Sequence, residues 1–159
     1  LNNYKPQFDG KNLAITDVSD AYGCNMAFRL SSIGVIKFDE RLPFYGWQED
    51  VDFSAQIRRK GRIVKANAVW GVHLGTKMGK TSGLRFGYSQ MINPLFVSRK
   101  GNMAPYRAVT LILRNLIANT FKSVFPEPYI DRRGRLVGNL KGLYHILQCL
   151  LEPTYILQI

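Results

Sequence analysis

The chain has 159 residues, of which 46% are hydrophobic and 12% are aromatic. This length and composition predict one packed domain, or a large part of one, and argue against a wholly disordered chain. No apolar run approaches the ~18–20 residues that cross a bilayer, which argues against a membrane-spanning protein.

The net charge of +11 is divided unevenly along the chain. Residues 1–53 carry five basic and eight acidic groups, whereas residues 54–159 carry seventeen basic and three acidic groups. This asymmetry predicts a carboxylate-bearing site beside a surface that attracts anions, such as nucleic acid, a nucleotide phosphate or an anionic lipid face.

The first half of the chain is expected to mix strands and helices. In chain order the expected elements are a polar, turn-rich segment over residues 1–20, a buried strand over Tyr22–Leu30, a short helical turn from Ser31 to about Lys37, a loop over Phe38–Gln48, a helix over Glu49–Gly61 and one or two short strands over Arg62–Val72. The helix over Glu49–Gly61 is favoured because acidic residues open the segment, basic residues close it and a glycine follows.

The second half is expected to be a loop followed by a helical tail. The expected elements are a glycine-rich basic loop over residues 74–90, a short apolar and basic segment over Pro94–Lys100, an amphipathic helix over Tyr106–Lys122 and a second one over Leu140–Leu151. We expect at least one of these two helices to pack on the domain. Cys24 and Cys149 match no disulfide framework or zinc spacing, so we expect two buried, reduced thiols.

Glu49, Asp50 and Asp52 place three carboxylates within four residues, directly after Trp47 and Gln48. At a helix start, Glu49 and Asp50 would face the positive end of the helix dipole, which favours ionised carboxylates. An ionised carboxylate in a cleft can accept a proton from a substrate hydroxyl. The simpler interpretation is that these groups cap the helix and contact water, and residue types alone favour it.

Two further features have both a functional and a structural interpretation. His73 follows an apolar strand and could bind a metal or a phosphate, although a hydrogen-bonded structural histidine is the commoner case. The glycines and lysines of residues 74–83 could form an anion-binding lid through backbone N–H groups or a plain surface loop, and their spacing does not match the phosphate-binding GxxxxGK[ST] motif.

Several segments, read together, resemble the C-terminal half of family-2 glycosyltransferases with the GT-A fold. They are GCNMAFR (Gly23–Arg29), FDERLPFYGWQEDVDFSAQIRRKGR (Phe38–Arg62), the strand ending at His73, and DRRGRLVGNLKGL (Asp131–Leu143) with Glu152-Pro153 after it. The block is also similar to the galactosyltransferase C-terminal domain. The resemblance implies an α/β fold with residues 1–100 as the acceptor-side part of the catalytic domain and residues 101–159 as a helical extension. The nucleotide-binding half with its DxD motif is expected upstream, so these residues alone are expected to be incomplete and inactive.

The resemblance also implies a reaction: inverting transfer of a sugar from a nucleotide-sugar donor to the hydroxyl of a saccharide or lipid-linked saccharide, in bacterial polysaccharide or glycolipid synthesis. The roles it implies are Asp50 as general base, Glu49 as its support, Gly23, Cys24 and Asn25 as a turn flanking the sugars, Trp47 as a stacking platform, His73 as a ligand of a divalent Mn or Mg ion, and Lys77, Lys80 and Arg85 as a lid over the diphosphate. The location expected from this is the cytoplasm or the cytoplasmic face of the membrane.

Two other classes of function compete with the transferase. A basic nucleic-acid-binding module would use the positive rear half, with Tyr106, Tyr129 and Tyr144 for stacking, but no recognised nucleic-acid-binding motif accompanies it and we expect no nucleic-acid partner. A membrane-surface module would lay the two amphipathic helices on an anionic bilayer, which is also compatible with a transferase that acts on a lipid-linked acceptor.

Overall fold

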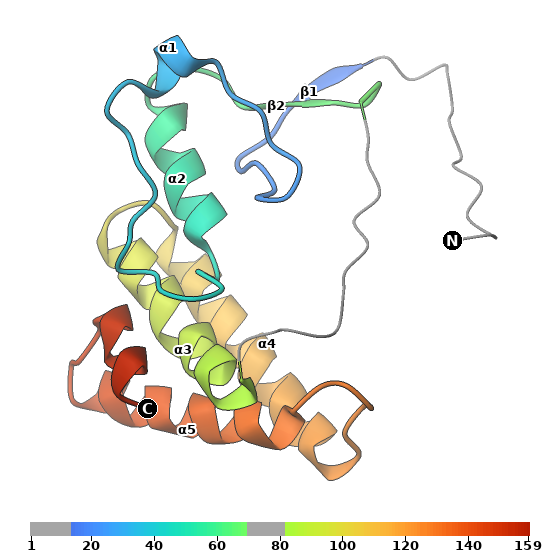
Figure 1. Cartoon of the computed structure of the whole chain (residues 1–159), viewed down its shortest axis with the longest axis vertical. Coiled ribbons are helices and arrows are strands. Elements are labelled where there is room, and N and C mark those ends of the chain that lie inside the picture. The colour runs from blue at the N-terminus through green and yellow to red at the C-terminus, as the bar shows by residue number, and fades with distance from the viewer. Residues whose placement is uncertain (1–13, 70–81) are drawn as a thin grey trace, which may run out of the picture.

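The computed structural model describes residues 14–69 and 82–159, of which 54% are helical and 4% are in strands. The elements are β1 (Ile15–Asp17), α1 (Leu30–Ile33), α2 (Glu49–Arg58), β2 (Val64–Ala66), α3 (Gly83–Arg99), α4 (Pro105–Val124), α5 (Arg132–Leu147) and the 3₁₀ helix η1 (Pro153–Gln158) (Figure 1). The expected mixture of helices and strands is thus present, but the described part of the chain is mostly helical. No described helix has both the length and the apolar character needed to cross a membrane.

β1 and β2 form a two-stranded antiparallel sheet in which Ile15 pairs with Ala66 and Asp17 with Val64. All six residues of the two strands are exposed. Arg62 adds a bidentate ion pair to Asp17, with both N–O distances at 2.9 Å. In Figure 1 this sheet projects to one side of α2 and away from the lower helices.

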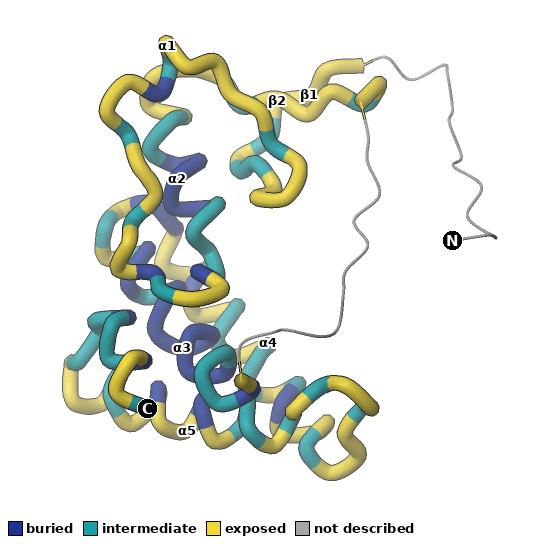
Figure 2. Tube along the Cα trace, in the orientation of Figure 1, coloured by how far each residue is buried: buried dark blue, intermediate teal, exposed yellow. Residues whose placement is uncertain are grey.

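α3 is the central helix and the most continuously buried one (Figure 2). Its C-terminal half packs Phe96 and Val97 against Leu42, Val51 and Met103, and so joins the loop before α2 to the helices. Its N-terminal half packs Tyr88 and Ile92 against Ile156 of η1. The Tyr88 hydroxyl lies 2.8 Å from Nδ1 of His145, which joins α3 to α5.

The contact between α3 and α5 depends on glycines. A Cβ on Gly87 would collide with the carbonyl of Arg135, and a Cβ on Gly138 would collide with the carbonyl of Leu84. Gly142 likewise leaves room only for the side chain of Met91. The two backbones therefore approach more closely than any larger residue would allow.

A buried carboxylate joins α2 to the corner between α3 and α4. Asp52 is fully buried, and its carboxylate accepts hydrogen bonds from Lys100 Nζ at 2.7 Å and from Asn102 Nδ2 at 2.8 Å. Lys100 also contacts Asp39 at 2.6 Å. Arg41 and Lys100 together hold the pKa of Asp39 well below its usual range through their hydrogen bonds. These charges are thus shared within one network rather than left isolated in the interior.

The helices expected over Glu49–Gly61 and Tyr106–Lys122 are confirmed as α2 and α4. The buried strand expected over Tyr22–Leu30 is wrong. This segment is a turn, closed by a hydrogen bond from Asn25 N to Tyr22 O at 2.8 Å, followed by extended chain that is mostly exposed. Its hydrogen bonds go to α2 rather than to a neighbouring strand.

The loop expected over residues 74–90 is wrong from residue 83 onward, because α3 begins at Gly83. The Ser82 hydroxyl caps this helix by accepting a hydrogen bond from Arg85 N. The helix then continues through Pro94, which is buried inside it, so the segment expected over Pro94–Lys100 is the end of α3. Glycine and proline indicate loops locally, but here tertiary packing overrides that preference.

The second amphipathic helix begins earlier and ends earlier than expected, as α5 over Arg132–Leu147 instead of Leu140–Leu151. The Asp131 carboxylate caps its start by accepting a hydrogen bond from Gly134 N at 2.7 Å. Cys24 and Cys149 are free thiols, as expected, but both are exposed rather than buried.

We expect Gly138→Ala to lower the free energy of unfolding by about 2 kcal/mol, because the new methyl group must displace the backbone of α3. The measurement is urea unfolding followed by circular dichroism. The control is Gly61→Ala, since a Cβ at Gly61 meets nothing within 4 Å. If helix propensity decided the outcome, alanine would instead stabilise α5, and equal effects at the two positions would contradict the close contact.

We expect Asp52→Ala to lower the free energy of unfolding by about 3 kcal/mol, because it removes the partner of Lys100 and Asn102 in a buried position. The matched control is Asp17→Asn, which removes an ion pair on the surface and should change stability little. Equal effects of the two substitutions in chemical denaturation would show that Asp52 does not anchor α2.

Candidate functional site

The acidic cluster lies where the sequence predicts it, in the first turn of α2. Gln48 adopts a left-handed backbone conformation with φ of 76°, and Glu49 N donates to Gly46 O at 2.7 Å, so the chain turns sharply into the helix. Glu49 and Asp50 therefore sit at the helix N-terminus, where the dipole stabilises negative charge. Gly46 has a φ of 54°, which favours glycine. The Glu49 carboxylate also occupies the position that a Cβ on residue 46 would take.

The carboxylate of Asp50 contacts the turn at Gly23. Asp50 Oδ2 accepts a hydrogen bond from Gly23 N at 3.1 Å, and Oδ1 accepts one from Val51 N at 2.9 Å. A second link, from Ala21 N to the Ser54 hydroxyl at 3.0 Å, holds the same segment on α2. Two segments that are 27 residues apart in the sequence thus meet at one carboxylate.

The turn also places two polar side chains near Asp50. A hydrogen bond with Cys24, the largest influence, raises the pKa of the Tyr22 hydroxyl, and the nearby charge of Asp50 adds to the shift. Asn25 closes the turn through its backbone N–H. Gly23, Cys24 and Asn25, which the sequence singled out as one group, therefore form a single exposed turn beside the carboxylate.

Glu49 differs from Asp50 in its surroundings. Burial, with the neighbouring Asp50 carboxylate adding to it, raises the pKa of Glu49 above its usual value of 4.5. Glu49 therefore holds its proton to a higher pH than a solvated glutamate would.

Trp47 and Arg85 belong to a cluster of aromatic side chains and one guanidinium group. This cluster joins the loop before α2 to the start of α3. The ring of Phe86 on α3 lies edge-on to Tyr45, at 5.5 Å between centroids, and to Trp47, at 6.4 Å. Asn93 Nδ2 donates to the Trp47 carbonyl at 2.9 Å and fixes the loop on α3. Arg85 lies over the Phe44 ring at 4.7 Å.

Arg85 is therefore a residue of the first turn of α3 and not of a loop. Besides Phe44 it contacts the C-terminal residue, donating from Nε to Ile159 O at 3.1 Å. His73, Lys77 and Lys80, the other residues predicted for the metal and the lid, lie outside the described residues.

Among the described residues, the acidic residues of α2 are not gathered into a group of metal ligands. The residues Asp50-Val51-Asp52 match the DxD pattern in sequence. The Asp52 carboxylate, however, already accepts hydrogen bonds from Lys100 and Asn102 in the interior. Across residues 14–69 and 82–159, no cluster of three His, Cys, Asp or Glu side chains is placed to hold a metal ion.

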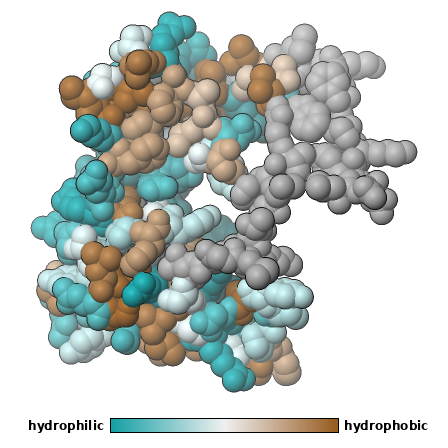
Figure 3. Space-filling view, in the orientation of Figure 1, coloured by the Kyte–Doolittle hydropathy of each residue, from teal (hydrophilic) through white to brown (hydrophobic). Residues whose placement is uncertain are grey.

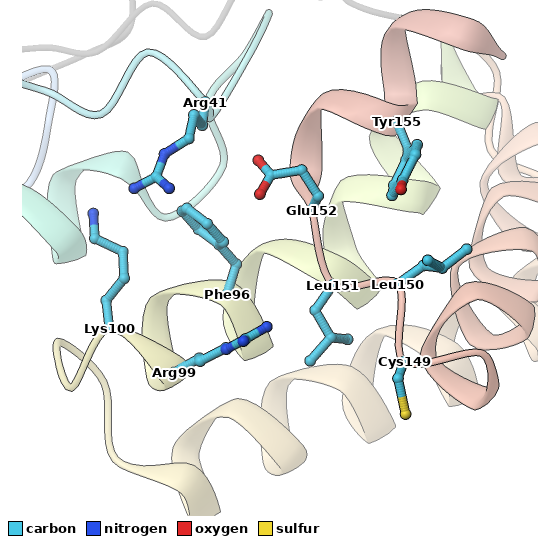
Figure 4. A pocket seen from close by; sticks show the side chains of 9 residues that line it. All are labelled: Arg41, Phe96, Arg99, Lys100, Cys149, Leu150, Leu151, Glu152 and Tyr155. Atoms are coloured by element: carbon cyan, nitrogen blue, oxygen red, sulfur yellow. The ribbon is translucent and has the colours of Figure 1, made fainter.

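The structure also contains a pocket of about 490 Å³ that the sequence did not indicate (Figure 4). It lies between the C-terminal half of α3 and the segment before η1, and its lining residues are Arg41, Phe96, Arg99, Lys100, Cys149, Leu150, Leu151, Glu152 and Tyr155. The Glu152 carboxylate points into it, opposite Arg41, and Oε1 of Glu152 is buried with no hydrogen-bond partner in the described part of the chain. No short motif could have revealed this pocket, because its walls come from segments that are far apart in the sequence.

Comparison of the chain with models of protein families, with curated proteins and with solved structures finds no match in any of the three.

The raised pKa of Glu49 predicts a specific pH dependence. Folding favours its protonated form, so its contribution to the free energy of unfolding falls as the pH rises from 4.5 through the raised folded pKa. The glutamine of Glu49→Gln is uncharged at every pH. The free energy of unfolding of this variant, relative to that of the wild type, should therefore increase with pH across that range. Urea unfolding between pH 4 and pH 7 measures this difference, and Glu40→Gln, which removes an exposed carboxylate from the preceding loop, is the control. If the stability of Glu49→Gln relative to the wild type fell with rising pH, the burial of Glu49 would be contradicted.

Proposed function

We propose that this chain is the acceptor-side part of an inverting GT-A glycosyltransferase of family 2, with Asp50 as the general base. The observation that carries the proposal is the hydrogen bond from Gly23 N to the Asp50 carboxylate. It joins the two segments on which the resemblance depends, GCNMAFR and the block that contains Glu49-Asp50. The same contact leaves Asp50 at the helix start beside an exposed turn, where an acceptor can approach.

The proposed reaction transfers a sugar from a nucleotide-sugar to the hydroxyl of a saccharide or a lipid-linked saccharide. The Asp50 carboxylate takes the proton of that hydroxyl while its oxygen attacks the anomeric carbon. The bond from that carbon to the nucleotide diphosphate breaks, and its electron pair leaves with the diphosphate, so the configuration at the anomeric carbon inverts. Asp50 lies in the first turn of α2, where it can accept this proton from the approaching hydroxyl.

The surrounding residues support this assignment. The turn of Gly23, Cys24 and Asn25 contacts Asp50, and the loop with Tyr45 and Trp47 leads directly into the same helix start. Aromatic rings commonly supply flat apolar surfaces for ligands in binding sites. Glu49, which holds a proton more readily than a solvated glutamate, is suited to a hydrogen bond with a second hydroxyl of the acceptor.

The donor side is a further part of the proposal. It requires the nucleotide-binding half with its DxD motif and a divalent Mn or Mg ion, for which His73 is the candidate ligand in this chain. The described residues supply no metal cluster, so we derive no step through the ion. Lys77 and Lys80 keep their proposed role at the diphosphate, whereas Arg85, fixed on α3 by Phe44 and Ile159, is better placed to hold the aromatic loop than to move as a lid.

The competing nucleic-acid module draws less support. Tyr106, Tyr129 and Tyr144 are exposed, as stacking would require, but Tyr106 and Tyr144 are accompanied on the outer faces of their helices by bulky aliphatic side chains. Binding to single-stranded polynucleotides that weakens steeply with salt would favour that module over the transferase.

The test is Asp50→Asn in the protein that carries the nucleotide-binding half before Leu1. Transfer should fall by about 10²–10⁴-fold in kcat, the usual contribution of a general base. The KM for the donor should stay within about twofold, because Asp50 acts on the acceptor side. Glu40→Gln, a charge-neutralising change at an exposed position of the preceding loop, is the matched control and should transfer normally. Unchanged turnover of Asp50→Asn would end the assignment.

A further inference from the structure

The outer face of α4 is apolar and exposed. Tyr106, Leu113, Ile117 and Phe121 recur at the spacing of one helical face, and they are 77%, 51%, 54% and 74% exposed. Val109 and Val124 extend the same stripe. The apolar stripe of this amphipathic helix therefore faces outward.

α5 presents a second outward stripe of the same kind, formed by Val137, Leu140, Tyr144 and Leu147, which are all exposed. In the view of Figure 3, hydrophobic and hydrophilic residues alternate along the lower edge of the molecule, where α5 runs. α4 and α5 contact each other as well as α3, so both stripes belong to one helical unit.

The inside of this unit holds a cluster of buried amides, from Gln90, Asn119 and Asn139, beside its apolar core. Asn119 Nδ2 donates to Gln90 Oε1 and to Asn139 Oδ1, both at 2.8 Å, and Asn139 Nδ2 donates to the Gly87 carbonyl at 2.7 Å. These buried amides join α3, α4 and α5, beside the glycine contact of Gly87 with α5. Small residues and buried amides thus supply much of the contact between the three helices, and the large apolar side chains on the outer faces of α4 and α5 take no part in it.

The charge of the same segment is complementary to an anionic surface. Residues 105–147 carry seven basic and two acidic groups, a net charge of +5. Arg114 lies beside Leu113 on α4, and Arg133 and Lys141 lie on α5; all three are exposed. A second copy of this chain would bring the same positive charge to the contact, whereas anionic lipid head groups would neutralise it.

We propose that the outer faces of α4 and α5 bind an anionic lipid bilayer, with the helices lying in the plane of the surface. The apolar stripes enter the boundary between head groups and acyl chains, and the basic residues beside them pair with lipid phosphates. This proposal depends on α4 and α5 alone and stands or falls independently of the transfer reaction.

The test is flotation of the purified chain with vesicles of phosphatidylcholine alone or with 30% phosphatidylglycerol. Binding should be at least tenfold tighter to the anionic vesicles and should weaken with added salt. Leu113→Glu should weaken binding to anionic vesicles at least tenfold. Val35→Glu is the matched control, because it introduces the same charge at a residue that is 90% exposed and lies outside α4 and α5, and its binding should stay within twofold.

Two further variants separate the apolar from the charged contribution. Ile117→Gln removes an apolar contact without adding charge and should weaken binding even if Leu113→Glu fails to fold. Arg114→Gln with Lys141→Gln should weaken binding to anionic vesicles by about fivefold for each charge removed, and should leave binding to phosphatidylcholine unchanged.

Three results would overturn the proposal. The first is a folded wild-type chain that does not float with anionic vesicles. The second is equal loss of binding for Val35→Glu and Leu113→Glu. The third is a stable dimer in light scattering that Leu113→Glu dissociates, which would assign the stripe to a second copy of the chain.

Discussion

The hydrogen-bonded ion pair between Asp52 and Lys100 is the interaction on which the placement of the candidate site depends. A fully buried carboxylate must be matched by its partners, and Lys100 and Asn102 both come from the corner between α3 and α4. Arg59, at the end of α2, donates to the side chain of the same Asn102 at 2.6 Å. α2 is therefore fixed on the helical unit along its buried side. Its first turn is thereby free to present Asp50 to the turn at Gly23.

The two proposals use different parts of one helical framework. α3 carries the aromatic loop, because Asn93 and Phe86 hold Trp47, and it also contacts α4 and α5. If α4 and α5 rest on a bilayer, α3 fixes the height of the site relative to that surface, because the glycine contact with α5 allows little sliding. A lipid-linked acceptor would then be held near the carboxylate by geometry rather than by affinity alone.

Local signals predicted the elements that are locally determined. The order of acidic and basic residues in α2 and the spacing of apolar residues in α4 predicted both helices. The resemblance to glycosyltransferases predicted that Gly23 and Asp50 belong to one site. α3 was missed because Gly83, Gly87 and Pro94 indicate a loop in isolation, although here the glycines serve the contact with α5. The outward direction of the α4 stripe could not be predicted either. Hydrophobic spacing shows that a helix has two faces, but not what covers each one.

The two-stranded sheet has a consequence for how firmly the site is assembled. A pair of three-residue strands, exposed throughout, has little free energy of its own in water. Its amide protons should therefore exchange through local opening, at a small fraction of the free energy that protects α3. The turn at Gly23 lies between this sheet and α1, and it is held on α2 by the hydrogen bonds of Ala21 and Gly23. The surroundings of Asp50 are thus rigid on the side of α2 and adjustable on the side of the turn.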